Sequence, residues 1–295
     1  PIFNLNPPSN SGNIHSGWGT ESSSVTRTLV TGATGMLGTV LQSRLTAAGH
    51  TIRAASRDPP EEHGGDLEWV ELDLIDGRGV NTSLDDIDVI IHAATAPQGD
   101  TEAVDVRGTK RLLTAAEEAE VENFLYPSIV GIDDIPFSYY EHKRVAEEAV
   151  EASDVPTTIV RATQFHSFVA QLLGFVAKLP IWPLPTKVQV QPIDVADLAD
   201  IIVNHAMEAG TGRTDPVGGP EILSVGELAQ TYRDVRGLRR PILRLPLPGG
   251  TAASFRAGHA TCPEHTVGTV SWKDWLTERY SSNVERMNAD SQSPA

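Results

Sequence analysis

One short stretch, LVTGATGMLG at residues 29–38, limits the fold of this chain more than any other. It places Gly32, Gly35 and Gly38 after a short apolar run and before apolar residues at helical spacing. At a strand-to-helix junction, such glycines permit a tight turn, let a phosphate approach the backbone and allow the helix to pack closely. The free N–H groups at the start of the helix favour an anion. The stretch therefore predicts an α/β fold with a phosphate-bearing ligand on its first helix.

Strand and helix patterns alternate from residue 25 onward. Alternation of this kind gives right-handed βαβ units and a parallel sheet covered by helices on both faces. We therefore expect an α/β fold, a Rossmann-type doubly wound parallel sheet with a small C-terminal substrate lobe. The strand patterns lie at 26–32, 51–57, 67–74, 88–94, 122–128 and 156–163, and the first helical patterns at 36–50, 105–121 and 138–153.

The composition along the chain predicts four parts. Residues 1–24, rich in Ser, Asn, Gly and Pro, are expected to form a flexible leader, and residues 281–295 a flexible tail. The nucleotide-binding core is expected at 25–161 and the end of the sheet plus the substrate lobe at 162–280. Prolines gather in this last part, where the regular alternation loosens.

The overall composition argues against several classes of partner. The 295 residues carry a formal net charge of −16, which disfavours binding to nucleic acid. Cys262 is the only cysteine in the sequence, which excludes a disulfide within the chain and fits a cytoplasmic location. No apolar run reaches the roughly 18 residues of a membrane span, and no histidine spacing is typical of a metal site. We therefore expect no membrane partner and no metal.

The stretch TLVTGATGMLG resembles the nucleotide loop of the short-chain dehydrogenase/reductase superfamily. The likeness is to the extended and atypical (NmrA-like) branches, whose loops commonly read TGATGxxG, and it covers roughly residues 26–206. It implies that the chain binds a nicotinamide dinucleotide. Within the loop, it implies cofactor contacts from Gly32, Thr34, Gly35, Met36, Leu37 and Gly38.

The end of the second strand predicts which dinucleotide is preferred. Ser56 stands where NAD-preferring relatives carry an aspartate, and Arg57 follows it. A hydroxyl and a guanidinium suit the 2′-phosphate of NADP(H), whereas a carboxylate would suit the ribose hydroxyl of NAD(H). We therefore expect NADP(H), with NAD(H) less favoured. The alternative for Arg57 is a solvated surface side chain.

The same resemblance implies cofactor contacts at the ends of other strands. Asp73 corresponds to an aspartate near the adenine amino group, although a carboxylate at this position can equally cap a turn. Small residues after the fourth strand let the backbone lie beside the cofactor, and residues after the sixth strand surround the nicotinamide. The implied contacts are Asp73, Leu74, Ala93, Ala94, Thr95, Ala162, Thr163 and Phe165.

The sequence SYYEHK places Tyr139 and Lys143 four residues apart, on one face of a predicted helix. A phenol with a pKa near 10 is a poor catalyst at neutral pH, and a nearby ammonium lowers that pKa. In the related superfamily, such a tyrosine exchanges a proton with a carbonyl oxygen, and the lysine also binds the nicotinamide ribose. The alternative is a tyrosine packed on the core beside a solvated lysine.

A hydroxyl that orients the substrate is harder to identify. Relatives carry a Ser or Thr just past the fifth strand, but here Ser128 falls one position early and Ile129 occupies the usual place. Because a one-residue offset at a strand end turns a side chain to the opposite face, Ser128 can take the catalytic role only if the loop shifts.

These residues together predict an NADPH-dependent oxidoreductase for a small, hydrophobic carbonyl or conjugated substrate, working as a monomer or homodimer. Gln164 and His166 are candidates to face that substrate. Two other functions stay open on this fold: a nucleotide-sensing regulatory protein, and a non-redox enzyme such as an epimerase, dehydratase or cyclase. The apolar pocket wall is expected from Phe165, Phe168, Leu172, Phe175, Ile181 and Trp182.

Overall fold

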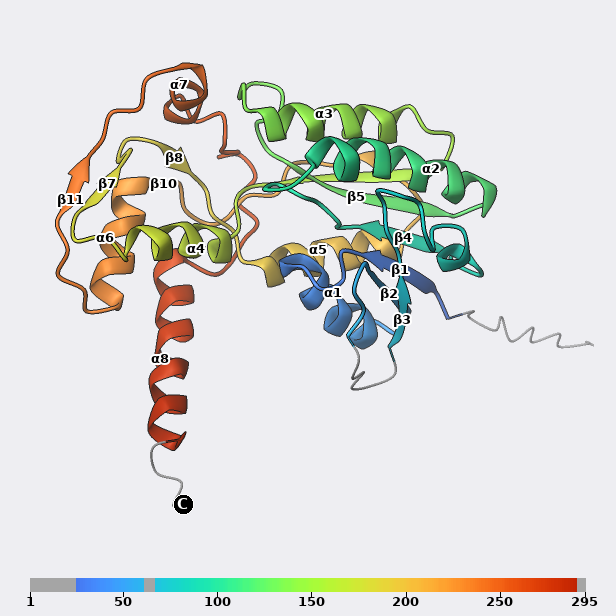
Figure 1. The fold of residues 1–295 in the computed structure, drawn as a ribbon, viewed down its shortest axis with the longest axis horizontal. Coiled ribbons are helices and arrows are strands. Elements are labelled where there is room, and N and C mark those ends of the chain that lie inside the picture. Colours follow the sequence, from blue (N-terminus) through green and yellow to red (C-terminus); the bar gives the residue numbers. More distant parts are fainter. Residues whose placement is uncertain (1–24, 61–66, 291–295) are drawn as a thin grey trace, which may run out of the picture.

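A parallel sheet of seven strands forms the centre of the molecule (Figure 1). The computed structural model describes residues 25–60 and 67–290, with side chains as far as residue 281, so the predicted leader lies outside the described residues. The strand order is β3-β2-β1-β4-β5-β6-β9, which confirms the expected doubly wound sheet. The strands are β1 (Arg27–Thr31), β2 (Thr51–Ser56), β3 (Glu68–Glu71), β4 (Val89–His92), β5 (Asn123–Ile129), β6 (Thr157–Ala162) and β9 (Gly212–Arg213).

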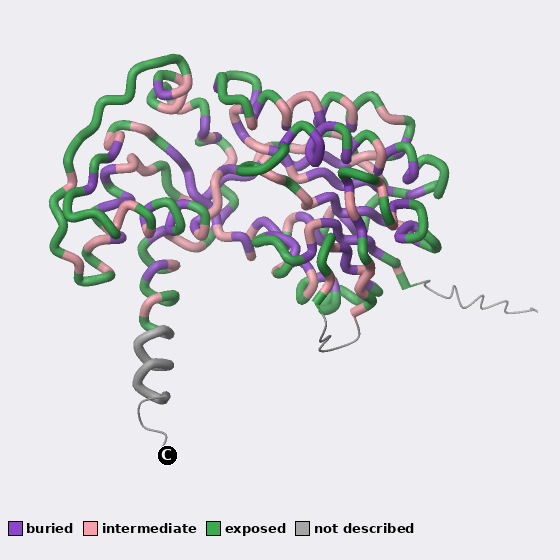
Figure 2. The backbone as a smooth tube through the Cα atoms, viewed as in Figure 1, coloured by how far each residue is buried: buried purple, intermediate pink, exposed green. Residues whose placement is uncertain are grey.

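Helices cover both faces of this sheet (Figure 1). On one face, α1 (Met36–Ala47) and α5 (Val195–Ala206) pack together over the strands through side chains such as Leu41 and Ile202. On the other face, α2 (Thr109–Glu118) and α3 (Ser138–Glu151) do the same. The strands β1 and β4 are buried along nearly their whole length, as expected for parallel strands between two helical layers, and Figure 2 shows this buried centre.

The helix expected at 105–121 begins earlier than its sequence pattern indicates. A π-helical segment, η2 (Glu102–Gly108), leads directly into α2. The buried carboxylate of Asp105 lies within η2 and accepts hydrogen bonds from the Thr95 hydroxyl and the Ala96 N–H. These contacts hold η2 against the loop that follows β4, close to the end of the sheet.

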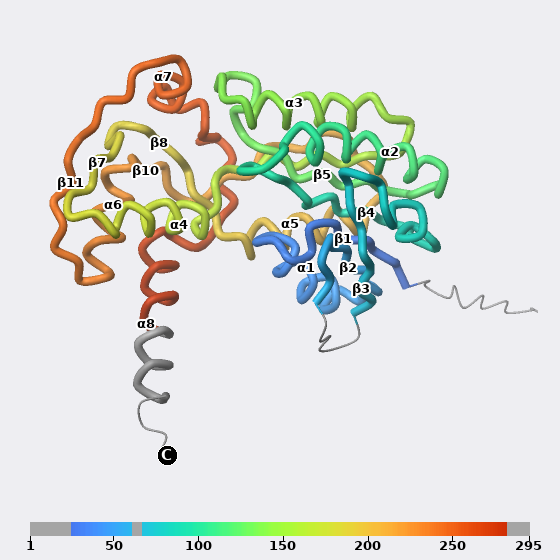
Figure 3. Tube along the Cα trace, in the orientation of Figure 1, coloured from blue at the N-terminus to red at the C-terminus, as the bar shows by residue number. Residues whose placement is uncertain are grey.

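Most of the chain after β6, apart from α5 and β9, forms a lobe beside the sheet (Figure 3). Its own core contains Trp182, Tyr232, Trp272 and Leu276. A capping box of Ser224 and Glu227 starts one of its helices. The lobe consists of α4 (His166–Val176), β7 (Trp182–Leu184), β8 (Gln189–Val190), β10 (Leu223–Ser224), α6 (Val225–Val235), β11 (Ile242–Arg244), α7 (Gly250–Arg256) and α8 (Trp272–Asp290).

The helix α8 differs from the sequence-based expectation. We expected a flexible tail from residue 281, but α8 continues to Asp290. Its first turns are held by the buried side chains of Trp272 and Leu276, and each residue added to an existing helix gains a backbone hydrogen bond. Within the described residues, none of the helices combines the length and apolar character needed to cross a membrane.

Candidate cofactor and catalytic site

A large cavity of about 1340 Å³ lies where the carboxyl ends of the strands meet the lobe. It is bounded by the β1–α1 loop, the ends of β2, β4 and β6, and the start of α3 on the sheet side, and by α4, α6 and α7 on the lobe side. The strand order reverses direction between β1 and β4. In open α/β sheets, ligands bind in the crevice at such a switch point.

The β1–α1 turn and the start of α1 require glycine at two positions. Gly32 has a φ of +66°, and a Cβ atom at this position would lie 2.7 Å from the backbone N and Cα of Ala94. A Cβ atom at Gly38 would lie 2.3 Å from the carbonyl oxygen of Gly32. Gly38 does not line the cavity, so its expected contact with the cofactor is not found. It instead allows α1 to pack against the turn.

The start of α1 offers a binding position for an anion. Its N-cap residue, Gly35, provides no side-chain cap, and the first turn contains no acidic residue. The first N–H groups of a helix have no partner within the helix, and here Met36 and Leu37 line the cavity. A helix end with open N–H groups and a glycine turn without Cβ atoms fits the pyrophosphate of a dinucleotide.

The residues expected at the adenosine end also line the cavity. Ser56 and Arg57 lie there together with Asp58. The Ser56 hydroxyl donates to the backbone oxygen of Asp58 and accepts from its N–H, both at 3.3 Å. Asp73 lines the cavity beside Leu74, and its Oδ1 accepts from the Ile75 N–H at 2.7 Å, so it caps the turn, while its contact with the adenine stays a prediction.

The residues expected at the nicotinamide end gather at the other side of the same cavity. They come from the ends of β4 and β6, which are neighbours of β5 in the sheet. Those lining the cavity are Ala93, Ala94, Thr95, Ala162, Thr163 and Phe165.

Tyr139 belongs to a short chain of hydrogen bonds that the sequence did not predict. Its Oη lies 2.9 Å from the Oγ1 of Thr95, which donates to Oδ1 of Asp105 at 2.6 Å. A threonine hydroxyl has one proton, so Tyr139 is the donor to Thr95. Asp105 is only 1% exposed, and a charged residue at an inward position of a helical pattern is rare enough to have signalled this role.

Lys143 contacts other groups than the Tyr139 hydroxyl, which the sequence led us to expect as its partner. Its Nζ donates to the backbone oxygen of Pro127 at 3.2 Å, lies 4.0 Å from Oδ1 of Asp105 and lies 4.0 Å from the ring centre of Tyr126. Within the described parts of the chain, no hydrogen bond joins it to Tyr139. Burial lowers the pKa of Lys143 to about 8, although Asp105 and Glu147 act in the opposite direction.

The expected lowering of the Tyr139 pKa is therefore wrong for this structure. Burial raises the pKa of Tyr139 well above its ordinary value, and the charge of Asp105 adds to the effect, while the hydrogen bond to Thr95 opposes it. The reason is that the Lys143 ammonium is directed to Asp105 and Pro127 rather than to the phenol.

Ser128 lines the cavity, but its hydroxyl is already engaged. It donates to the buried carboxylate of Glu147, which also pairs with Arg161 and Arg213. The one-residue offset seen in the sequence thus places the hydroxyl on an ion-pair cluster. Thr95 is the residue whose hydroxyl contacts Tyr139.

The lobe side of the cavity is largely apolar. Phe165, Phe168 and Leu172 line it as expected, and Gln164 lies beside them. Trp182 is instead buried in the lobe core, while Phe175 and Ile181 are exposed outside the cavity. His166 does not face the cavity, because it is buried and its Nε2 donates to the backbone oxygen of Val270 at 2.9 Å. Wall residues that the sequence did not predict include Val176, Leu228 and Phe255.

Comparisons with known proteins find several relatives of similar sequence. The chain is 28% identical over 224 residues to an uncharacterised protein of Mycobacterium tuberculosis, covering 75% of this chain and 24% of that protein. The chain thus spans about a quarter of the length of this relative. It is 29% identical over 220 residues to a (4-alkanoyl-5-oxo-2,5-dihydrofuran-3-yl)methyl phosphate reductase of Streptomyces griseus, covering 72% of this chain and 74% of that enzyme.

The chain is also similar to a second reductase and to an enzyme of known structure. A ceramide reductase of Caulobacter vibrioides is 28% identical over 240 residues, covering 75% of this chain and 74% of the enzyme. The crystal structure of the Bordetella bronchiseptica enzyme WbmF in complex with NAD⁺ superposes with a TM-score of 0.68 at 16% identity, covering 90% of this chain and 95% of that one. The structural likeness shows the fold alone.

The match to a family model concerns the part of the chain that builds the cofactor end of the cavity. The model is described as NAD(P)H-binding and matches residues 32–208. This range begins at Gly32 and includes the glycine turn, the ends of β2, β4, β5 and β6, and the Tyr139–Lys143 helix. The chain therefore belongs to the NAD(P)H-binding family, with the Rossmann fold of the short-chain dehydrogenase/reductase type.

Proposed function

We propose that this chain is an NADPH-dependent oxidoreductase acting on a small, hydrophobic carbonyl or conjugated substrate. The observation that carries the proposal is the continuity of one cavity, which contains the uncapped start of α1, the Tyr139 hydroxyl and the apolar wall of the lobe. A dinucleotide on the glycine turn and an apolar substrate against Phe168 and Leu172 would both have room in it.

In this proposal NADPH supplies the hydride when bound. Tyr139 supplies the proton: the phenol is protonated at neutral pH and can donate as negative charge develops on a carbonyl oxygen, although burial raises its pKa and makes it a weaker acid in this structure. The Thr95 hydroxyl can then turn its own proton from Asp105 toward the phenolate and stabilise it.

The proposal is tested by following NADPH oxidation against aldehydes, ketones, quinones and enones. We expect turnover of at least one hydrophobic member of this set.

A second function, nucleotide sensing without turnover, is favoured by one observation, the direction of Lys143 toward Asp105 rather than Tyr139. Tight NADPH binding without oxidation of any substrate in the set would favour the sensor over the oxidoreductase.

Replacing Arg57 with alanine is expected to weaken NADPH binding about tenfold and to leave NADH binding unchanged, because only NADPH carries the 2′-phosphate that a guanidinium would bind. Titration of both nucleotides by cofactor fluorescence measures the two dissociation constants. Arg44→Ala is the matched control, since Arg44 pairs with Asp200 and does not line the cavity. An unchanged NADPH affinity in Arg57→Ala contradicts the assignment of the 2′-phosphate site.

NADPH binding is also expected to weaken as the pH rises from about 7 to about 9. Lys143 loses its positive charge as the pH passes its pKa of about 8, whereas the phosphates of NADPH are already ionised above pH ~7. The Lys143→Met variant should bind weakly and show no such dependence. Titrations at several pH values measure this difference, and a wild-type affinity that stays constant across the range would argue against a cofactor contact from Lys143.

A further inference from the structure

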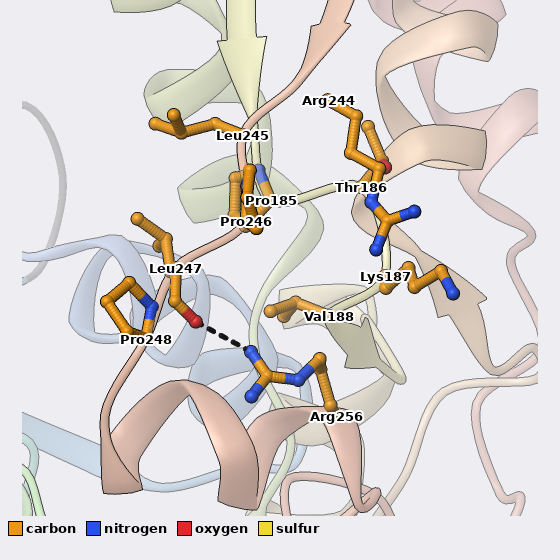
Figure 4. Close-up of a pocket in the computed structure, with 10 residues that line it drawn as sticks. All are labelled: Pro185, Thr186, Lys187, Val188, Arg244, Leu245, Pro246, Leu247, Pro248 and Arg256. Carbon is orange, nitrogen blue, oxygen red and sulfur yellow. Dashed lines mark hydrogen bonds between the residues drawn. The ribbon is translucent and has the colours of Figure 1, made fainter.

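We infer that the substrate carries an anionic oxygen group, a phosphate or a carboxylate, and that a second pocket in the lobe binds it. The inference rests on the proposed function, because it assigns a class of substrate to the same cavity. The pocket has a volume of about 350 Å³ and is lined by three cationic side chains, Lys187, Arg244 and Arg256, together with leucines, prolines and Val188 (Figure 4).

The two segments that line this pocket carry a positive net charge, whereas the chain as a whole is negatively charged. The chain has 39 Asp and Glu residues against 23 Lys and Arg, yet residues 155–193 and 235–263 contain no Asp or Glu. These two segments supply every residue that lines the pocket. In a chain with a net charge of −16, such a segregated cationic region attracts an anionic ligand to this position.

The cations themselves are available to a ligand. Within the described residues, Lys187 and Arg244 form no ion pair and no hydrogen bond through their side chains. Arg256 donates one hydrogen bond, from Nη1 to the backbone oxygen of Leu247 at 2.9 Å, which leaves its other N–H groups for a ligand. Figure 4 draws the charged ends of Arg244 and Lys187 to the right of Val188 and the guanidinium of Arg256 below it.

The backbone that carries Arg244 is held in place by strand pairing. The strand β11 pairs in parallel with β7, with Arg244 opposite Leu184, and the Leu245 N–H donates to the backbone oxygen of Leu184 at 2.8 Å. Leu245 and Leu247 remain 43% and 41% exposed beside the cations. Apolar side chains next to unpaired cations suit a ligand with an apolar body and an anionic end.

The second pocket adjoins the large cavity, because the two share lining residues. Pro185, Val188, Leu247 and Pro248 line both of them. The helix α7 also serves both, because Arg256 lines the pocket and the preceding Phe255 lines the cavity. An apolar chain can therefore lie along Val188 and Leu247, with its carbonyl toward Tyr139 and its phosphate or carboxylate among Lys187, Arg244 and Arg256.

The test measures binding of hexyl phosphate, hexanoate and hexan-1-ol by isothermal titration. Saturating NADP⁺ is present, so that the start of α1 is not available to the probes. We expect hexyl phosphate to bind most tightly, hexanoate less tightly and hexanol weakly, with an affinity for hexyl phosphate that falls as salt is added. The variants Lys187→Ala, Arg244→Ala and Arg256→Ala should each lose about tenfold in affinity for hexyl phosphate and almost nothing for hexanol.

Arg240→Ala is the matched control, because Arg240 lies in the same acid-free segment but lines neither space. Equal binding of hexyl phosphate to the wild type and to the three pocket variants overturns the inference, and so does an equal loss in Arg240→Ala. Failure of the proposed function is a separate result. If the protein binds hexyl phosphate through Arg244 but oxidises no NADPH, the anion site is supported and the oxidoreductase function is contradicted. If it oxidises NADPH with equal KM values for neutral and anionic substrates, the oxidoreductase function is supported and the anion site is contradicted.

Discussion

The Tyr139→Phe variant is expected to lose about 10²- to 10⁴-fold in kcat/KM for NADPH-dependent reduction, the range typical of a removed general acid. The substitution removes the hydroxyl that contacts Thr95 and leaves the ring in the cavity wall. The dissociation constant of NADPH should stay within about twofold, because the expected phosphate and ribose contacts come from other residues. Steady-state kinetics and a cofactor titration on the same preparation measure both quantities.

Tyr140→Phe provides the control for that experiment. Tyr140 is the next residue on α3 and also lines the cavity, but its hydroxyl is not part of the chain that leads to Asp105. We expect it to keep most of the wild-type activity. Full turnover by Tyr139→Phe would remove this residue as the proton donor, and an equal loss in both variants would indicate a general disturbance of α3.

Replacing Gly32 with alanine is expected to abolish measurable NADPH binding and to destabilise the fold. The residue has a φ of +66°, and its new Cβ atom would lie 2.7 Å from the backbone of Ala94. The left-handed conformation costs about 1–2 kcal/mol and a steric overlap of this kind adds about 1–3 kcal/mol to the loss in unfolding free energy. Urea denaturation and NADPH titration give the two measurements.

Gly49→Ala separates these two costs. Gly49 also has a positive φ, of +88°, but a Cβ atom there would meet nothing within 4 Å. This variant should lose only the conformational part, about 1–2 kcal/mol, and should bind NADPH normally. If the two alanine variants lose the same stability and both still bind NADPH, the close approach of Gly32 to Ala94 has no role in the nucleotide turn.

Local sequence patterns predicted which residues line one end of the cavity. The glycine turn, Ser56 with Arg57, and the small residues after β4 are each carried by one strand and the loop that follows it. Because parallel strands end at the same edge of the sheet, residues just past those ends line one crevice whatever the details of packing. Gly38 is the exception among the loop glycines, since its role is contact between α1 and the turn.

Partners that are far apart in the chain were not predictable in the same way. Thr95 and Tyr139 are 44 residues apart, and their contact depends on how η2 and α3 pack beside the sheet. The spacing of Tyr139 and Lys143 predicted a shared helix face, but the ammonium is directed to Asp105 on a different element. The prediction of the pocket-lining residues in the lobe was partly wrong for a similar reason. Apolar residues such as Trp182 are equally suited to a protein core and to a pocket lining, and the sequence does not distinguish the two.

The sequence by itself determined the family, the parallel sheet and the glycine turn after its first strand, because periodic apolar patterns and a glycine turn act within a few residues of one another. The tertiary structure alone decided that Thr95 contacts Tyr139, that Glu147 takes the hydroxyl of Ser128, and that Lys187 and Arg256 line one pocket. Each of these pairs joins separate elements, and the distance between such elements depends on how the whole core packs.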